Sequence, residues 1–280
     1  MVPMSMLRRY SPLPMVTLLL AWVSCAAAAD MPAGCDTTAA PPMLDLSHPP
    51  NLGIFKDQLL RYRCTNYEKD IAAVLQEARD WIKQRAPQVR NPAIVLDIDE
   101  TSLSNWKQIL QDEYPFPPHP ACSFKQEICS DRDWKWSQEA PAIQPVLDLY
   151  KLAQCIDTTP PCTKVDVYFV TGRRDGDKYV PKEICNQPVD KCDPSLPKTP
   201  AEWTLGNLQK AGFAGVPRDH LYMRPKDSSG QVSDFKKNQR IAIENLGKTI
   251  IANVGDQESD LVGLHAERTF KVPNPFYFIP

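Results

Sequence analysis

The sequence predicts an α/β fold in which a mostly parallel sheet is flanked by helices. Short apolar runs typical of buried strands alternate along the chain with segments whose apolar residues recur every three to four positions. Three of the predicted strands end in polar or charged residues. Because the carboxyl ends of parallel strands meet at one edge of a sheet, we expect these polar residues to gather there.

Four strands are predicted from apolar runs, at 93–97, 164–170, 220–224 and 249–254. The run "KVDVYFV" and the run "TIIANV" have the length and the β-branched content of buried strands. Residues 30–54 lack any periodicity and are expected to be extended.

The helices between these strands are indicated by periodicity and by capping signals. Residues 55–86 carry apolar residues at i, i+3, i+4, i+7 and i+11, and a second set marks a helix around Val146 and Tyr150. Thr199, followed by a proline and then Glu202, is a capping-box signal for a helix that ends near Ala211. A further helix is predicted from about 234 to Gly247, which is a plausible C-terminal glycine.

The N-terminus has the pattern of a secretory signal peptide. Arg8 and Arg9 precede a short apolar run, and small residues follow up to Ala29, after which we expect cleavage. The run is too short to span a bilayer. The alternatives are an anchor that stays attached, or a lipoprotein acylated on Cys25, which Trp22 in the lipobox disfavours. We therefore expect export, to the periplasm or the medium.

Composition argues against two classes of partner. The formal net charge of the 280-residue chain is −2, and the two arginines lost with residues 1–29 would make it −4. Without a basic excess, the chain is not expected to bind nucleic acid. No second apolar stretch is long enough for a membrane span, so we expect no membrane association after signal cleavage.

The cysteines fit an exported protein. Eight remain after cleavage, and six of them form three pairs with the same C-x6-C spacing, which favours disulfides Cys122–Cys129, Cys155–Cys162 and Cys185–Cys192. Cys35 and Cys64 are then left to pair with each other. A zinc site is the alternative, which the absence of any C-x2-C pair and the presence of only four histidines disfavour.

The predicted strand ends bring a particular set of side chains to one edge of the sheet. The first strand is followed by Asp97 and Asp99, the second by Thr171, Gly172 and Arg173, and the last by Asp256 and Asp260, with Lys236 and Lys237 near the start of the helix before it. Crowded carboxylates raise one another's pKa unless a cation compensates them. Mg²⁺ prefers such oxygen ligands and leaves room for a phosphate. A hydroxyl and an ammonium can hold phosphoryl oxygens, and an aspartate can attack phosphorus.

Four ordered motifs resemble those of the haloacid dehalogenase (HAD) superfamily. "LDIDET" is similar to its first motif, D-x-D-x-T, and "VYFVTGR", Lys236 and "NVGDQESD" are similar to the second, third and fourth. The segments "DETSLSN", "TGRRD", "GDQESDL" and "TFKVPNPFYFIP" resemble the secreted acid phosphatases of subfamily IIIB, the plant acid phosphatase and bacterial class C group. The resemblance runs from about residue 55 to the end. It implies a Rossmann-like fold with a smaller irregular or helical cap.

The resemblance also implies a role for each acidic residue. Asp97 would be the nucleophile and a Mg²⁺ ligand, and Asp99 the general acid/base, giving its backbone carbonyl to the metal. Asp256 would be the third protein ligand, and Asp260 would contact the groups around the metal without binding the metal itself. Glu100, beside them, is expected to be structural or near the surface.

The remaining residues at this edge would bind substrate. Thr171 and Lys236 would hold the phosphoryl group, with Gly172 beside them. Lys237 is an alternative to Lys236, which we prefer from its spacing to the following arginine. Arg173 either contacts the substrate or forms a structural ion pair. The expected substrates are small-molecule phosphate monoesters.

Residues 55–280 are therefore predicted to form one phosphatase domain, with a cap-like insertion at about 106–140. The aromatic residues near this insertion either pack its core or stack on an aromatic leaving group: Trp106, Tyr114, Phe116, Trp134 and Trp136. The predicted activity is that of a Mg²⁺-dependent acid phosphatase acting through an aspartyl-phosphate on Asp97. A nucleotide-specific phosphatase, a phosphotransferase and a non-catalytic storage or binding protein are the alternatives.

Overall fold

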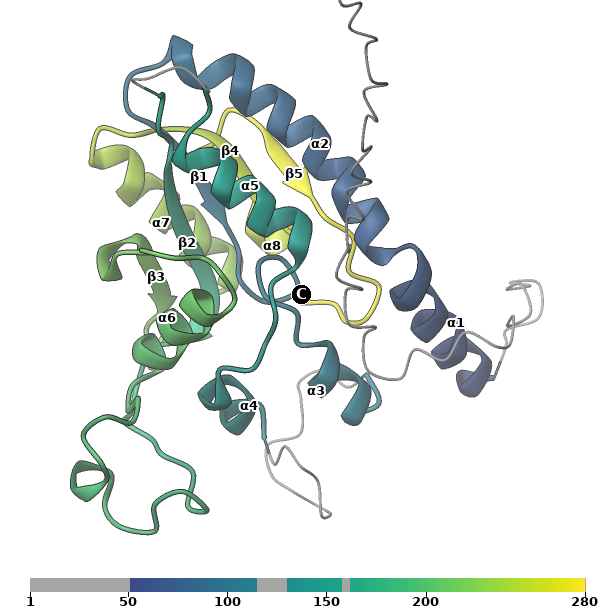
Figure 1. Cartoon of the computed structure of the whole chain (residues 1–280), viewed down its shortest axis with the longest axis vertical. Coiled ribbons are helices and arrows are strands. Elements are labelled where there is room, and N and C mark those ends of the chain that lie inside the picture. The colour runs from purple at the N-terminus through teal and green to yellow at the C-terminus, as the bar shows by residue number, and fades with distance from the viewer. Residues whose placement is uncertain (1–50, 115–129, 158–161, 280) are drawn as a thin grey trace, which may run out of the picture. The chain divides into compact units, whose positions relative to one another are not determined.

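The computed structural model describes residues 51–114, 130–157 and 162–279. Its centre is a parallel five-stranded sheet, which confirms the predicted α/β class (Figure 1). The strands follow the order β3 (Leu221–Arg224), β2 (Asp166–Arg174), β1 (Pro92–Leu96), β4 (Thr249–Gly255) and β5 (Thr269–Lys271). The sequence did not indicate β5, because a three-residue edge strand with one buried side chain gives no detectable period.

The sheet is buried on both faces. Along β1, Ile94 and Leu96 belong to the larger apolar core, while Ala93 and Val95 belong to a smaller one on the opposite face. This alternation is the two-residue period of a strand, and burial of both sets explains why the run is continuously apolar.

Helices cover the two faces of the sheet (Figure 1). The larger core is closed by α2 (Tyr67–Arg85) and α5 (Gln144–Gln154), which pack against each other, and the smaller core by α7 (Val232–Asn245). The remaining helices of the described residues that follow β2 are α6 (Pro200–Lys210) and α8 (Glu258–Leu261), with 3-10 turns at Val189–Lys191 and Arg218–His220.

The predicted helix at 55–86 is two helices. The first, α1 (Leu52–Thr65), begins earlier than expected because the Asn51 side chain accepts a hydrogen bond from the Ile54 amide. Asn66, with φ −118° and ψ −25°, separates α1 from α2, and a 3-10 turn at Ala86–Gln88 follows α2. Residues 30–50 of the segment predicted to be extended lie outside the described residues.

The capping signals in the sequence correspond to the observed helix ends. Thr199 and Glu202 form the predicted capping box at the start of α6. Gly247, two residues beyond α7, has φ +76°, which is the left-handed conformation that favours glycine after a helix.

Two short helices, α3 (Trp106–Gln111) and α4 (Asp131–Ser137), lie in the stretch that showed no clear period. Six and seven residues are too few for a periodic signal. Trp106 and Trp134 are buried in the main core and Trp136 is half-buried, whereas Phe116 lies outside the described residues. Trp106 and Tyr114 pack against each other and against Phe276. The described aromatic residues of this stretch therefore serve packing.

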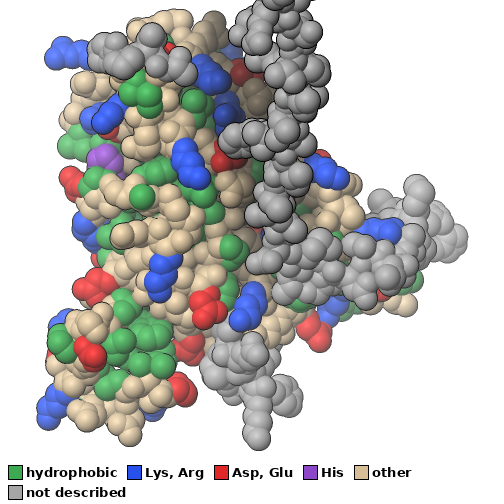
Figure 2. Space-filling model, viewed as in Figure 1, with side chains coloured by type: hydrophobic (Ala, Val, Ile, Leu, Met, Phe, Trp, Pro, Cys, Tyr) green, Lys and Arg blue, Asp and Glu red, His purple; other side chains and the backbone are tan. Residues whose placement is uncertain are grey.

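The disulfides Cys155–Cys162 and Cys185–Cys192 confirm two of the predicted pairs. Cys64 is also disulfide-bonded. Cys35, Cys122 and Cys129 lie outside the described residues, so the pairings that involve them stay predictions. On the face drawn in Figure 2, basic and acidic side chains are interspersed. Among the helices that the structure describes, none is long and apolar enough to cross a bilayer.

Candidate active site

The carboxyl ends of β1, β2 and β4 meet at one edge of the sheet, where a cavity of about 520 Å³ opens. Of the residues predicted from the sequence, seven line it: Asp97, Asp99, Gly172, Arg173, Lys236, Asp256 and Asp260. Thr171 is fully buried at the end of β2 and is not part of the lining. Residues up to 163 positions apart thus meet in one site, as expected for an open parallel sheet.

The loop after β1 positions the first two aspartates. The Asp97 amide donates to the Val254 carbonyl and continues the β1–β4 ladder. The chain then turns tightly around the Ile98 carbonyl, which accepts from three following amides, and the Ser102 hydroxyl donates to the Asp97 carbonyl. Glu100 adopts a left-handed φ of 53° inside this turn. As a result, the side chains of Asp97 and Asp99 both reach the cavity.

Lys236 is the lysine of the site. Its Nζ lies 2.5 Å from Asp97 Oδ1 and also contacts Asp260 Oδ1, with 5% of the residue exposed. Lys237 points elsewhere and pairs with Asp234 at 3.5 Å near the surface. Burial by itself lowers the pKa of Lys236, but the carboxylates of Asp260 and Asp97 raise it above its usual value overall. Lys236 therefore stays an ammonium group.

The carboxylates of the site are crowded in a poorly solvated place. Burial raises the pKa of Asp97 well above its usual value; Lys236 opposes the shift, and Asp260, Asp256 and Asp99 add to it. Burial, followed by the charge of Asp260, raises the pKa of Asp256 to about 6. Burial is the largest cause of both shifts, and the neighbouring carboxylate charges add to it.

Asp256 and Asp260 are held by donors from several elements. Asp256 accepts from the Thr101 hydroxyl at 2.9 Å and from the Gln257 and Asn274 amides at 2.6 and 2.7 Å. Asp260 accepts from the Gln257 backbone at 2.8 Å, in a capping box at the start of α8. A Cβ on Gly255 would lie 2.3 Å from the Asp260 side chain, so only glycine allows this close approach.

Three of these carboxylates form a group that could hold a metal ion. One oxygen each of Asp97, Asp256 and Asp260 lie within 4.8 Å of one another, and all three residues are buried. Within the described residues, the Asp99 backbone carbonyl accepts no hydrogen bond, which leaves it available as a further ligand. Both oxygens of Asp256 and of Asp260 already have donors, whereas among the described residues Asp97 Oδ2 has none, so Asp97 is the freest ligand of the three. An all-oxygen set with unbalanced negative charge fits Mg²⁺.

Asp99 forms an ion pair with Arg173. The Arg173 Nη2 lies 2.7 Å from Asp99 Oδ1, and its Nε lies 3.0 Å from Oδ2. Burial would raise the pKa of Asp99, but Arg173, with Lys135 and Asn105, lowers it below its usual value. In the free protein Asp99 is therefore ionised. Of the two roles predicted for Arg173, the structure shows the ion pair.

Residues that the sequence did not single out hold this pair in place. Asn105 Nδ2 donates to Asp99 Oδ1 at 2.8 Å, and the Trp134 indole donates to Asn105 Oδ1 at 2.8 Å. The Asn105 side chain thus connects α4 to the loop after β1. The sequence offered one signal for Asn105, which is the last residue of the segment "DETSLSN". Thr101, the partner of Asp256, belongs to the same segment.

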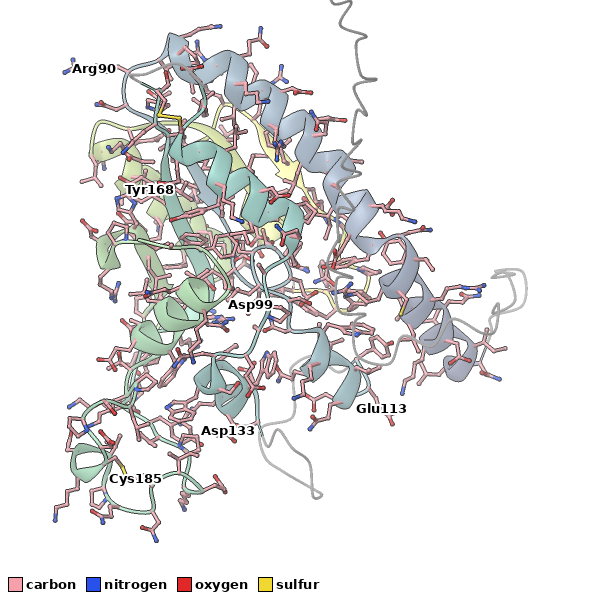
Figure 3. All side chains as sticks on the ribbon, viewed as in Figure 1. Arg90, Asp99, Glu113, Asp133, Tyr168 and Cys185 are labelled. Carbon is pink, nitrogen blue, oxygen red and sulfur yellow. A yellow bond between two sulfur atoms is a disulfide. The ribbon has the colours of Figure 1, made fainter. Side chains whose placement is uncertain are left out.

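Glu100 is structural, and its expected position near the surface is wrong. The residue is fully buried, and its carboxylate accepts hydrogen bonds from the Asn105 amide and from the Tyr67 hydroxyl on α2. Burial raises the pKa of Glu100 to about 7. Figure 3 shows Asp99 at the edge of the sheet, beside the loop that carries these residues.

The comparison with known families gives one match over most of the chain. The HAD superfamily, subfamily IIIB (acid phosphatase), matches residues 54–186 and 197–280. Acid phosphatase 1 of Solanum lycopersicum is 27% identical over 219 residues, which cover 76% of this chain and 69% of that protein. Vegetative storage protein 2 of Arabidopsis thaliana is 38% identical over only 77 residues, or 28% of each chain.

The fold is also that of a solved bacterial enzyme. The class C acid phosphatase of Bacillus anthracis superposes with a TM-score of 0.54 at 19% identity, covering 80% of this chain and 86% of that one. A second structure of the same enzyme carries bound tungstate. At this identity the likeness shows the fold, and the family match shows the class of activity. The chain belongs to the HAD superfamily, subfamily IIIB, and is an acid phosphatase, a phosphomonoesterase of that family.

Proposed function

We propose that this phosphatase hydrolyses small phosphate monoesters with the help of Mg²⁺ and that the phosphoryl group passes through Asp97. The observation that carries the proposal is the contact of Lys236 with Asp97 on the floor of the cavity. A buried ammonium beside the attacking carboxylate gives phosphoryl oxygens a charge partner in a poorly solvated place. Gly172 lines the same cavity. The buried Thr171 hydroxyl would have to turn toward the phosphoryl group.

The first step is attack by an Asp97 carboxylate oxygen on phosphorus. The new oxygen–phosphorus bond forms as the bond to the leaving alcohol oxygen breaks, and the leaving oxygen takes a proton from Asp99. In the second step Asp99 removes a proton from water as the water oxygen attacks phosphorus. Asp97 is released and inorganic phosphate forms.

Asp99 must gain a proton before it can act as an acid, because Arg173 keeps it ionised in the free protein. A bound phosphate dianion supplies the reason for the change. Its negative charge lies beside Asp99 and competes for Arg173, and both effects raise the pKa of Asp99. Arg173 would then contact the substrate, so its ion pair and its substrate role belong to two stages of one cycle.

The metal would be held by Asp97, Asp256 and the Asp99 carbonyl. Mg²⁺, when bound, would compensate the carboxylate charge and withdraw electron density from the phosphoryl oxygens. Asp260 would remain the partner of Lys236 and keep the ammonium group oriented. The observed disulfides fit the export that the N-terminal pattern predicts, to the periplasm or the medium.

The test is phosphate release from p-nitrophenyl phosphate across pH 4–8, with Mg²⁺ and with a chelator. We expect Mg²⁺-dependent turnover, and a fall of roughly 10⁴-fold in kcat for Asp97→Asn, since removing a nucleophile has effects of this order. Trapping of ³²P on the native protein, but not on Asp97→Asn, would identify the intermediate. Comparable turnover in Asp97→Asn would rule out this nucleophile. Adding an alcohol distinguishes hydrolysis from phosphotransfer, because phosphotransfer yields an alkyl phosphate.

A further inference from the structure

Most cationic side chains around the outer part of the cavity have a partner that offsets or spreads their charge. Lys135 pairs with Asp131 at 2.7 Å and Lys226 with Asp177 at 2.5 Å. The Arg132 guanidinium lies over the Tyr179 ring, 4.9 Å from its centre. Two guanidinium groups in the cavity lining differ from these: Arg174 and Arg224.

Arg174 and Arg224 are the last residues of β2 and β3 and lie opposite each other in the strand register. Within the described residues, neither has a carboxylate within 4.0 Å, and their contacts are to neutral oxygens of the 225–230 loop. Burial and the neighbouring charge of Arg174 lower the pKa of Arg224. Two like charges thus lie side by side without a counter-ion, an arrangement that an anion would relieve.

Both groups keep donors for a ligand. Arg174 uses only its Nη1 on the Pro225, Lys226 and Ser228 carbonyls, and Arg224 uses Nε and Nη2 on Ser228 and Gly230. Among the contacts of the described residues, Nε and Nη2 of Arg174 and Nη1 of Arg224 have no partner. Because the loop carbonyls hold each guanidinium in place, little conformational entropy is lost when these donors bind.

The position of this pair relates it to the phosphoryl site. The β2–β3 register shifts between Thr171 and Arg174, so β2 bulges at Gly172 and Arg173. The bulge lets Arg173 reach Asp99 while Arg174 returns to the end of the sheet, which is a known use of bulges beside active sites. Three residues along a strand span at most about 10 Å. The backbone of Arg174 is therefore at most about 10 Å from that of Thr171, and its side chain lines the same cavity as Asp97.

We propose that Arg174 and Arg224 form a second anion subsite in the cavity that holds Asp97, and that the preferred substrates are small phosphate monoesters that carry another phosphate or a carboxylate at the end away from the scissile phosphate. The inference rests on the proposed function, because it takes the phosphoryl group to bind at Asp97. The alternative is that both arginines only clamp the 225–230 loop. A clamp would not distinguish substrates by their second charge.

The test compares matched substrates in the purified full-length protein. The first pair is 6-phosphogluconate and glucitol 6-phosphate, two open chains that differ in a carboxylate at C1; the second is fructose 1,6-bisphosphate and fructose 6-phosphate, which differ in a phosphate. We expect the more charged member of at least one pair to have a kcat/KM about tenfold higher, and the pair that shows it identifies the anion. Equal values within both pairs would overturn the proposal.

The variants are Arg174→Gln and Arg224→Gln, with Lys178→Gln as the control. Lys178 is an exposed cation paired with Asp190 and is outside the cavity lining. We expect each arginine variant to lower the selectivity ratio by roughly three- to tenfold, and Lys178→Gln to leave it unchanged. A ratio that is the same in native protein and in Arg174→Gln would show that the arginine acts only as a clamp.

A measurement on the native protein keeps the inference testable if a variant does not fold. The selectivity ratio should fall between 50 and 500 mM NaCl, because salt screens partly exposed charges, and a ratio that does not change with salt would contradict the subsite. Hydrolysis of p-nitrophenyl phosphate in the same preparation separates the two claims. If Asp97→Asn retains that hydrolysis, the proposed function fails; if only the ratios fail, the subsite alone is wrong.

Discussion

The floor and the rim of the cavity hold their charges in different ways. On the floor, Lys236, Asp97 and Asp260 are 3–6% exposed and in direct contact. On the rim, Lys226 pairs with Asp177, and their side chains are 52% and 71% exposed. Buried charges that lose a partner are costly, whereas exposed pairs contribute little to stability. The difference indicates that substitutions on the floor affect the reaction and the fold, and substitutions on the rim affect the choice of substrate.

The adjacent lysines of α7 give the sharpest test of this comparison. Lys236→Met should lower kcat/KM by roughly 10²–10³-fold, because it removes the ammonium group at the phosphoryl site. It should also cost about 3 kcal/mol of stability, since two buried carboxylates lose their cation. Lys237→Met is the matched control, with little effect expected on either quantity. Steady-state kinetics and urea unfolding of both variants measure this, and similar losses in the two would contradict the assignment of Lys236.

The Asn105 side chain should be the next most sensitive position. Asn105→Ala removes the amide that orients Asp99, and groups that support active-site residues in this way typically contribute 10- to 100-fold. Trp134→Phe keeps an apolar ring but leaves Asn105 Oδ1 without its donor, so a smaller loss in kcat is expected. The pH dependence of kcat tests whether the effect passes through Asp99. A pH profile that is unchanged in Asn105→Ala would assign it a purely structural role.

Glu100 predicts a pH-dependent stability rather than a loss of activity. Its pKa is raised from 4.5 in the unfolded chain to about 7 in the folded protein, so the folded state binds a proton that the unfolded state has lost between these values. Stability should therefore fall as pH rises from about 4.5 to 7, by an amount on the order of 3 kcal/mol.

Glu100→Gln should remove this component. Urea unfolding at pH 5 and pH 8, in the presence of chelator, should show the variant gaining relative to the native protein at the higher pH. The opposite sign would mean that Glu100 is stabilised as a carboxylate. Most phosphatase activity should remain, because Glu100 contacts Tyr67 and Asn105 and does not line the cavity.

The smallest effect is expected at the Cys185–Cys192 disulfide, which lies outside the cavity lining, on the loop labelled at Cys185 in Figure 3. Replacing Cys185 and Cys192 together by alanine should lower the free energy of unfolding by about 2 kcal/mol in the chain-entropy model. The main observable result should be faster proteolysis of the 175–199 loop. The rate with p-nitrophenyl phosphate should change less than twofold. A tenfold loss would show that the loop supports the floor, contrary to the distinction between the two regions.

Sequence patterns predicted the class of fold, and the resemblance of four motifs to a known family predicted the kind of reaction. Periodicity and caps located β1, β2, β4, α5, α6 and α7 within a few residues, because each element carries its own burial pattern. The order of the motifs then placed Asp97, Lys236 and Asp256 at one edge, since parallel strands end together. These inferences depend on local signals and on one topological rule.

The tertiary structure decided which of these groups touch. The Arg173–Asp99 ion pair follows from a bulge in β2, and the Asn105–Trp134 hydrogen bond joins residues 29 positions apart. Burial of Glu100 likewise comes from α2 packing over the loop after β1. No periodicity reports such contacts, because side-chain partners depend on how separate elements pack. The sequence by itself therefore determined the kind of reaction, and only the packed structure decided the protonation state of Asp99 and the charges available at the rim.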